Sequence, residues 1–246
     1  MKPVLLLGGT TEASALAREL AEHGIAAIFS YAGRVESPKP QPLPTRTGGF
    51  GGAEGLADWL QAEGISAVID ATHPFAARMS QNAARACAGL NLPLCRLERA
   101  PWRPGPGDLW HQVPDLSAAH ALLQGPPRRV FLAIGRQHIG QFRDLPQHHY
   151  LLRLIDPPDE QPLPQAEMVI SRGPFSVAED LALLRAHRTG IILCKNAGGS
   201  GASAKLEAAR QLQVPVIMIA RPELPEALVF HQPDQVIAWL HTRLGV

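Results

Sequence analysis

The feature that most constrains this chain is an apolar run that ends in two glycines and continues into an amphipathic stretch. Residues 4–7 are Val-Leu-Leu-Leu, a pattern typical of a parallel strand covered on both faces. Gly8 and Gly9 then permit a tight turn. Small and apolar residues follow with helical spacing, at Ala13, Leu16, Ala17, Leu20 and Ala21. This strand–turn–helix unit predicts an α/β fold with parallel sheets.

The same turn has the chemistry of a phosphate site. Backbone N–H groups and a helix N-terminus converge there, and a threonine can cap the helix. We therefore expect the turn to hold a nucleotide cofactor through Gly8, Gly9, Thr10, Thr11 and Glu12. The spacing departs from the usual G-x-G-x-x-G fingerprint, so an ordinary strand-to-helix turn without a ligand is the alternative.

The end of the predicted second strand indicates which nicotinamide cofactor is used. NAD-binding folds commonly have an acidic residue there for the ribose 2′-hydroxyl, but no carboxylate occurs between Phe29 and Val35. Ser30, Tyr31 and Arg34 stand there instead. A hydroxyl and a guanidinium suit a 2′-phosphate, which favours NADPH over NADH. The alternative is that Arg34 is a solvated loop residue.

Two further loops are rich in glycine. Gly48 and Gly49 begin a run of four glycines in five positions, and we expect them to line the cofactor pyrophosphate or ribose. The second loop, residues 195–205, has a lysine at each end. Its expected ligand contacts are Lys195, Asn196, Gly198 and Gly199. For both loops, a flexible surface segment is the alternative.

A polar segment follows the predicted strand at residues 67–70. Polar groups at the carboxyl end of a parallel strand lie where doubly wound folds bind ligands. We expect Thr72 to contact the cofactor and His73 to act as a catalytic residue near the nicotinamide. A purely structural histidine is the alternative.

Composition limits the protein class. Lys and Arg total 23 and Asp and Glu total 22, so the net charge of +1 argues against nucleic acid or a membrane as partner. Cys87, Cys95 and Cys194 form no C-x-x-C pattern, so we expect buried thiols in a reducing cytoplasm and no metal site. The first apolar run is too short for a signal peptide or a membrane span.

A pattern of proline, strand and arginine that occurs once in each half of the chain predicts two lobes. One predicted strand lies between Pro93 and Arg99, and another lies between Pro215 and Arg221; the same spacing separates the two prolines and the two arginines. We expect two Rossmann-like lobes with parallel sheets and an inter-lobe cleft. Residues 1–100 would form the NADPH-binding lobe, and residues 108–246 would form an α/β lobe that completes the cofactor and substrate cleft.

Stretches from one end of the chain to the other carry a family resemblance. They read LLLGGTTEASALA, TRTGGFGG, DATHPFA, LAIGR, SRGPF, KNAGGSGASAK and PVIMIARP. In this order they resemble the precorrin-6A reductase family of cobalamin (vitamin B12) biosynthesis. One departure is Ala197, where the family usually has a serine.

The resemblance implies NADPH-dependent reduction of one double bond of the precorrin-6A macrocycle, giving precorrin-6B. A related branch of the family reduces the cobalt-containing substrate. The carboxylates of such a tetrapyrrole would be met by basic residues at Arg46, Arg136, Arg172, Lys195, Lys205 and Arg221. Neighbouring enzymes of the pathway are the macromolecular partners that the resemblance suggests.

Two other functions fit parts of the pattern. A tetrapyrrole methyltransferase that uses S-adenosylmethionine would also need a glycine turn after its first strand. It would have no use for a phosphate site at Ser30 and Arg34. A non-catalytic two-lobed protein that binds a small anion is the second alternative.

Overall fold

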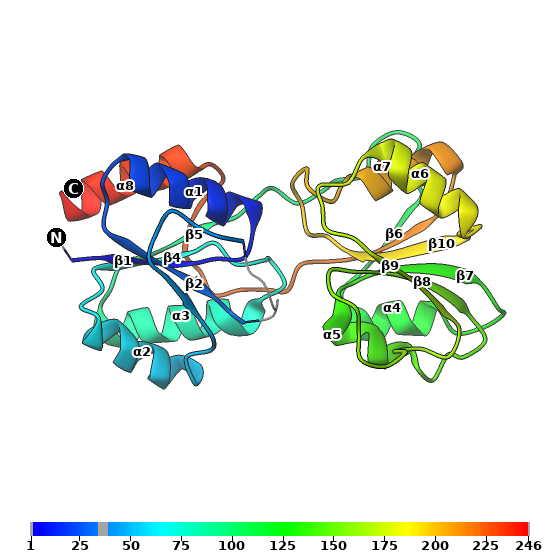
Figure 1. Ribbon diagram of the computed structural model, residues 1–246, viewed down its shortest axis with the longest axis horizontal. Coiled ribbons are helices and arrows are strands. Elements are labelled where there is room, and N and C mark those ends of the chain that lie inside the picture. The colour runs from blue at the N-terminus through cyan, green and yellow to red at the C-terminus, as the bar shows by residue number, and fades with distance from the viewer. Residues whose placement is uncertain (1, 34–38, 246) are drawn as a thin grey trace. The chain divides into compact units, whose positions relative to one another are not determined.

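The computed structural model describes residues 2–33 and 39–245 (Figure 1). Two compact units divide the chain: Met1–Ala100 with Glu223–Val246, and Pro101–Pro222. Arg34, expected at the cofactor 2′-phosphate, lies outside the described residues.

The first unit is built on a six-stranded parallel sheet. In spatial order its strands are β12 (Leu228–Phe230), β5 (Leu94–Leu97), β4 (Ala67–Asp70), β1 (Val4–Leu7), β2 (Ala27–Tyr31) and β3 (Thr45–Thr47). One face of the sheet is covered by α1 (Thr11–Glu22) and α8 (Pro233–Leu244), and the other by α2 (Gly52–Ala62) and α3 (Ala77–Leu90) (Figure 1).

The second unit has a six-stranded parallel sheet of its own. In spatial order its strands are β6 (Trp110–Val113), β11 (Val216–Ile219), β10 (Ile191–Lys195), β7 (Arg129–Ala133), β8 (His149–Leu154) and β9 (Ala166–Ile170). Its helices are α4 (Leu116–Leu122), α5 (Arg136–Ile139), the 3-10 turn η1 (Gly140–Phe142), α6 (Val177–Ala186) and α7 (Ala204–Leu212). Two parallel α/β sheets confirm the predicted fold class.

The unbroken apolar run of β1 has a direct explanation. Val4 and Leu6 face the core cluster that contains α1 and α8, whereas Leu5 and Leu7 face the cluster that contains α2 and α3. All four side chains are buried. Because alternate residues of a strand point to opposite faces, a strand covered on both faces must be apolar throughout. The prediction of a buried central strand is confirmed.

The expected extent of the second lobe was wrong at both ends. The lobe begins at Pro101 rather than at residue 108, and residues 223–246 return to the first unit. There β12 pairs with β5, and Val236, Ile237 and Leu240 of α8 join the first core. This return is hard to predict, since β12 has only three residues and none is fully buried. Its partner strand also lies far away in the chain.

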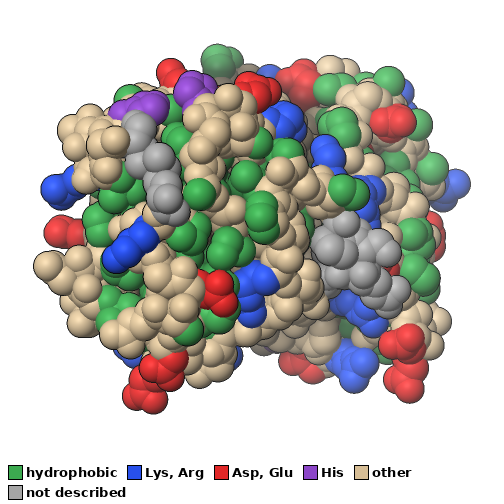
Figure 2. Space-filling model, turned by 60° about the vertical axis from the view of Figure 1, so that its left-hand side comes forward, with side chains coloured by type: hydrophobic (Ala, Val, Ile, Leu, Met, Phe, Trp, Pro, Cys, Tyr) green, Lys and Arg blue, Asp and Glu red, His purple; other side chains and the backbone are tan. Residues whose placement is uncertain are grey.

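Two surface properties bear on possible partners. Within residues 2–33 and 39–245, no helix combines the length and the apolar character that a membrane span needs. On the face drawn in Figure 2, basic and acidic side chains are interspersed, consistent with the net charge of +1.

Candidate functional site

The first turn, residues 8–12, leaves β1 at the carboxyl edge of the first sheet. Gly8 packs against the fully buried Phe29 of β2, and a Cβ at position 8 would overlap the phenyl ring. Gly9 has a φ of +121°, a conformation that residues with a side chain rarely adopt. Gly8 is therefore required by the close approach of this turn to β2, and Gly9 by its backbone conformation.

Thr10 fixes the start of α1. Its hydroxyl oxygen accepts the N–H of Ala13 at 3.0 Å, which makes it the N-cap. The same hydroxyl donates to the carbonyl of Ala71 at 2.9 Å. The start of α1 is thereby tied to the segment that follows β4.

The first turn presents amides without a protein acceptor. Among the residues that the structure describes, nothing accepts from the N–H groups of Gly9, Thr11 or Glu12. These groups lie at the positive end of the α1 dipole, where a phosphate is stabilised. The Glu12 carboxylate lies 3.1 Å from the Arg99 guanidinium and accepts the Thr11 hydroxyl at 3.0 Å. Its negative charge is thus balanced beside the turn.

Ser30 meets Arg46 across the next pair of strands. They are register partners in β2 and β3, and Ser30 is 4% exposed. Arg46 Nη1 donates to Ser30 Oγ at 2.8 Å and to the Gly48 carbonyl at 3.0 Å. Arg46 Nη2 donates to the Gly49 carbonyl at 3.1 Å. Three residues expected to contact the cofactor ribose or phosphates, Ser30, Gly48 and Gly49, are therefore joined by one guanidinium.

Tyr31 uses its hydroxyl within the chain. The phenol donates to the Lys39 carbonyl at 2.7 Å and accepts from Gln41 Nε2 at 2.6 Å. Its ring lies 4.6 Å from that of Phe29. The side chain therefore holds the segment after residue 38 against β2.

The end of β4 orders the Thr72–His73 segment. Asp70, which is 2% exposed, accepts the Thr72 hydroxyl at 2.7 Å and the Thr72 N–H at 3.1 Å. The guanidinium of Arg96 on β5 lies 3.7 Å from the other carboxylate oxygen. His73 Nδ1 accepts the N–H of Phe75 at 3.2 Å, so the proton of the neutral ring is on Nε2.

The second glycine loop, residues 195–205, is organised around Trp102. Asn196 Oδ1 accepts the Trp102 N–H at 2.8 Å, and Asn196 Nδ2 donates to the Trp102 carbonyl at 2.9 Å. The indole N–H donates to the Gly199 carbonyl at 2.7 Å. Lys205 Nζ lies 4.8 Å from the centre of the Trp102 ring. Both polar ends of the Asn196 side chain are thus engaged by the chain itself.

The other predicted contacts of this loop are backbone positions and a strand end. Gly198 and Gly199 have φ of +71° and +68°, so glycine is required by the backbone there. Lys195 is the last residue of β10. Arg221 donates to the carbonyls of Asn196 at 3.0 Å and Ala197 at 3.1 Å, which fastens the loop from the segment after β11.

The cysteines are buried thiols. Burial raises the pKa of Cys194 to about 11 and that of Cys87 to about 12, with Asp70 adding to the effect on Cys87. Neither is a thiolate nucleophile near neutral pH. Across the described part of the chain, no group of three or more His, Cys, Asp or Glu residues could hold a metal ion.

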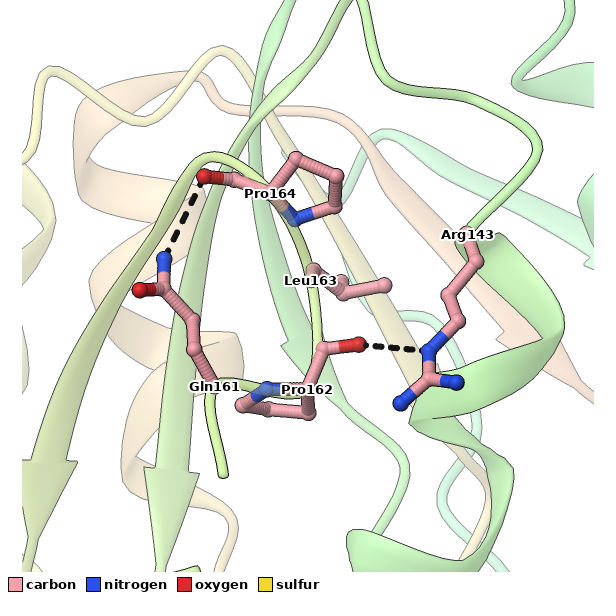
Figure 3. Close-up of a pocket in the computed structure, with 5 residues that line it drawn as sticks. All are labelled: Arg143, Gln161, Pro162, Leu163 and Pro164. Atoms are coloured by element: carbon pink, nitrogen blue, oxygen red, sulfur yellow. Dashed lines mark hydrogen bonds between the residues drawn. The ribbon is translucent and has the colours of Figure 1, made fainter.

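A surface hollow of about 330 Å³ lies elsewhere on the second unit (Figure 3). Arg143, Gln161, Pro162, Leu163 and Pro164 line it. Arg143 Nε donates to the Pro162 carbonyl at 3.0 Å, and Gln161 donates to the Pro164 carbonyl at 3.2 Å (Figure 3). None of the predicted site residues lines this hollow, so it is not the candidate site.

The structure groups the predicted residues of the first unit at one sheet edge. The residues after β1, β2, β3 and β4 all follow neighbouring parallel strands. Sequence reasoning did not identify the supporting groups Asp70, Arg96, Arg99 and Trp102. The carboxylate at a strand end was a usable signal for Asp70. No local pattern could reveal that Trp102 binds Asn196, because the two lie far apart in the sequence.

Comparison with known proteins agrees with this architecture. Residues 3–241 match the family described as "Precorrin-6x reductase CbiJ/CobK". A precorrin-6A reductase of Rhodobacter capsulatus is 57% identical over 241 residues, covering 98% of this chain and 96% of the relative. A solved structure titled "CobK precorrin-6A reductase" has a TM-score of 0.95 at 56% identity, covering 99% of this chain and 97% of that one.

A more distant relative provides a contrast. The cobalt-precorrin-6A reductase of Priestia megaterium is 27% identical over 248 residues, covering 95% of this chain and 96% of that protein. The match to the family runs through both units and includes the first turn, the Thr72–His73 segment and the second glycine loop. The chain therefore belongs to the precorrin-6x reductase CbiJ/CobK family.

Proposed function

We propose that this protein reduces one double bond of precorrin-6A to give precorrin-6B, with NADPH as the reductant. The observation that carries the proposal is the first turn, in a chain that belongs to this family. Its amides, at the start of α1, offer the donors that a dinucleotide pyrophosphate needs. The turn lies beside Ser30 and Arg46, which supply a hydroxyl and a cation at the end of β2.

The metal-free macrocycle is the favoured substrate over the cobalt-containing one. The Rhodobacter capsulatus relative, named for precorrin-6A, is 57% identical, whereas the Priestia megaterium relative, named for the cobalt form, is 27% identical. Within the described residues no cluster of metal-ligating side chains occurs, but cobalt in the substrate would be held by the macrocycle itself. Similarity rather than site chemistry therefore supports this choice.

The residues of the first unit take defined parts in this proposal. Gly9, Thr11 and Glu12 bind the pyrophosphate through backbone N–H groups, while Gly8 and Thr10 hold the turn in shape through Ser30 and the α1 N-cap. Ser30 and Arg34 receive the 2′-phosphate, Tyr31 supports them, and Gly48 and Gly49 approach the ribose or pyrophosphate. When bound, the reduced nicotinamide supplies the hydride.

Thr72 and His73 are proposed to lie near the nicotinamide. Asp70 holds the Thr72 hydroxyl at 2.7 Å, which fixes this segment for contact with the cofactor. Because His73 Nδ1 accepts the Phe75 N–H, Nε2 is the ring nitrogen that can carry a transferable proton, so this atom is the proposed proton donor to the reduced macrocycle. Lys195, Asn196, Gly198 and Gly199 are the proposed contacts from the second unit, with Asn196 acting through the shape of its loop.

The direct test is an anaerobic reaction of the purified protein with precorrin-6A and NADPH. We expect loss of NADPH absorbance with formation of a product heavier by two hydrogens, and much weaker activity with NADH. His73→Ala should lower kcat while leaving the Kd for NADPH within about threefold, since the cofactor binds mainly through other groups. An unchanged kcat would remove His73 from the chemistry. Methyl transfer from S-adenosylmethionine, without NADPH oxidation, would overturn the reductase proposal.

A further inference from the structure

Arg46 is held in one orientation at the carboxyl edge of the first sheet. Hydrogen bonds to Ser30, Gly48 and Gly49 fix its two terminal nitrogens. The guanidinium carbon also lies 3.8 Å from the centre of the Phe50 ring. Hydrogen bonds on one side and an aromatic face on another leave little rotamer freedom, so the side chain is pre-organised.

The charge of Arg46 is not balanced by a carboxylate in the part of the chain that the structure describes. Its three hydrogen-bond acceptors are a hydroxyl and two carbonyls, all neutral. Burial lowers the pKa of Arg46, the direction expected for a cation that loses solvent without gaining a negative partner. A partly desolvated guanidinium in this situation is stabilised by an anion.

Two other arginines near this edge have a different environment. Arg96 lies 3.7 Å from the Asp70 carboxylate, and Arg99 lies 3.1 Å from the Glu12 carboxylate. For these two the fold supplies the negative partner itself. Arg46 instead has acceptors that orient the group and leave its charge available.

We propose that Arg46 binds the 2′-phosphate of NADPH and is a specificity-determining residue for NADPH over NADH. This inference rests on the proposed function and adds to it a residue expected from the sequence to meet a substrate carboxylate. In doubly wound folds the adenosine ribose lies at the end of the second strand, where Ser30 and Arg46 are register partners. A guanidinium has five donors, and three are used, so two remain for phosphate oxygens. The Ser30 hydroxyl hydrogen can supply a third bond.

The test uses two fragments that differ only in the 2′-phosphate: ADP-ribose 2′-phosphate and ADP-ribose. Their Kd values are measured by calorimetry with the full-length wild type and with Arg46→Gln, Arg46→Lys and Arg18→Gln. Arg18 is exposed on α1, so its substitution removes the same charge away from the strand ends. Affinity for ADP-ribose reports whether the rest of the site is intact.

We expect the wild type to prefer the phosphorylated fragment, and Arg46→Gln to weaken that fragment on the order of 10- to 100-fold. Affinity for ADP-ribose should stay within about threefold, because it contacts the first turn instead. Arg46→Lys should have an intermediate effect, since it keeps the charge but loses the planar fork. Arg18→Gln should behave as the wild type.

Three outcomes would overturn the inference. Equal weakening of both fragments by Arg46→Gln would show a structural role only. Unchanged binding of both, with a raised KM for precorrin-6A, would assign Arg46 to a substrate carboxylate. A wild type that binds both fragments equally would remove the 2′-phosphate site and leave an NADH-dependent reductase. If the wild type bound neither fragment nor NADPH, the proposed function itself would fail.

Discussion

The two glycine segments that follow central strands differ in what occupies their polar groups. After β1, the amides of Gly9, Thr11 and Glu12 have no acceptor among the described residues. After β10, the Asn196 side chain and the Gly199 carbonyl are bound by Trp102. Glycine after a strand therefore indicates a backbone that turns tightly or is closely approached. Whether a ligand or the chain itself fills the site depends on distant residues.

The two sheets make a second comparison. Five of the six strands follow corresponding orders, β5-β4-β1-β2-β3 in the first sheet and β11-β10-β7-β8-β9 in the second. The sixth strand differs: β6 precedes the other strands of its sheet in the chain, whereas β12 follows all of the others. The chain thus crosses between units twice, and the first unit cannot complete its sheet until the last residues are made.

The largest expected effect concerns the packing of the first turn. Gly8→Ala should lower the free energy of unfolding by about 3 kcal/mol, because the new Cβ would overlap the buried Phe29 ring. NADPH affinity should also fall. Chemical denaturation and hydrogen exchange resolved by unit would measure the change. Gly201→Ala is the control, since no atom lies within 4 Å of its Cβ and its φ is not positive. Equal losses of unfolding free energy in the two variants would show that the close packing of Gly8 against Phe29 does not matter.

The second glycine loop should depend on its internal contacts. Asn196→Ala should cost about 2 kcal/mol, since it leaves the Trp102 N–H and carbonyl without their partners. Hydrogen exchange should increase at residues 101–103 and 195–205 but not in the first unit. Asn82→Ala on α3 is the matched control and should be nearly neutral, because Asn82 is half-buried in a helix where alanine is favourable. A stable Asn196→Ala protein would indicate that ligand contact, not loop shape, is its role.

The N-cap of α1 should contribute less to the free energy of unfolding than the Asn196 contacts do. Thr10→Val should destabilise the protein by about 1 kcal/mol, because the N-cap bond to Ala13 and the bond to Ala71 are both lost. Thr10→Ser keeps the hydroxyl and should change the unfolding free energy by less than about half that amount. Thermal unfolding measures both. A serine variant as unstable as the valine variant would assign the loss to the methyl group.

The smallest effect depends on pH and concerns the start of the second unit. Burial alone would raise the pKa of Asp108, but hydrogen bonds from Arg210 and Gly105 lower it below the ordinary value. Its stabilising effect is therefore fully present above the unfolded-state pKa of about 3.9 and is lost as the pH falls through the lower folded-state pKa. Asp108→Asn should cost about 0.5 kcal/mol at pH 7. The difference in unfolding free energy between this variant and the wild type, measured in urea, should disappear at acidic pH. A difference that does not change with pH would contradict a stabilising role for the ionised Asp108 carboxylate.

Local residue patterns are enough to predict the individual strands and helices and the residue types at their ends. The apolar run of β1 and the helical spacing after it specify a covered strand and its helix, because side-chain periodicity is a local property. The capping box of Ser176 and Glu179 at the start of α6 is local in the same sense, because its two residues are three positions apart. The ordered motifs also indicated the family correctly.

Long-range contacts, in contrast, set which unit the C-terminal residues join and which polar groups have a partner within the chain. The return of β12 to β5 depends on a pairing between segments far apart in the sequence, and β12 itself is short and partly exposed. The hydrogen bonds between Arg46 and Ser30 and between Trp102 and Asn196 also join segments that are separated in the sequence. Hydrogen-bond partners depend on distance in space, and a local residue pattern cannot specify that distance when the two groups come from different elements.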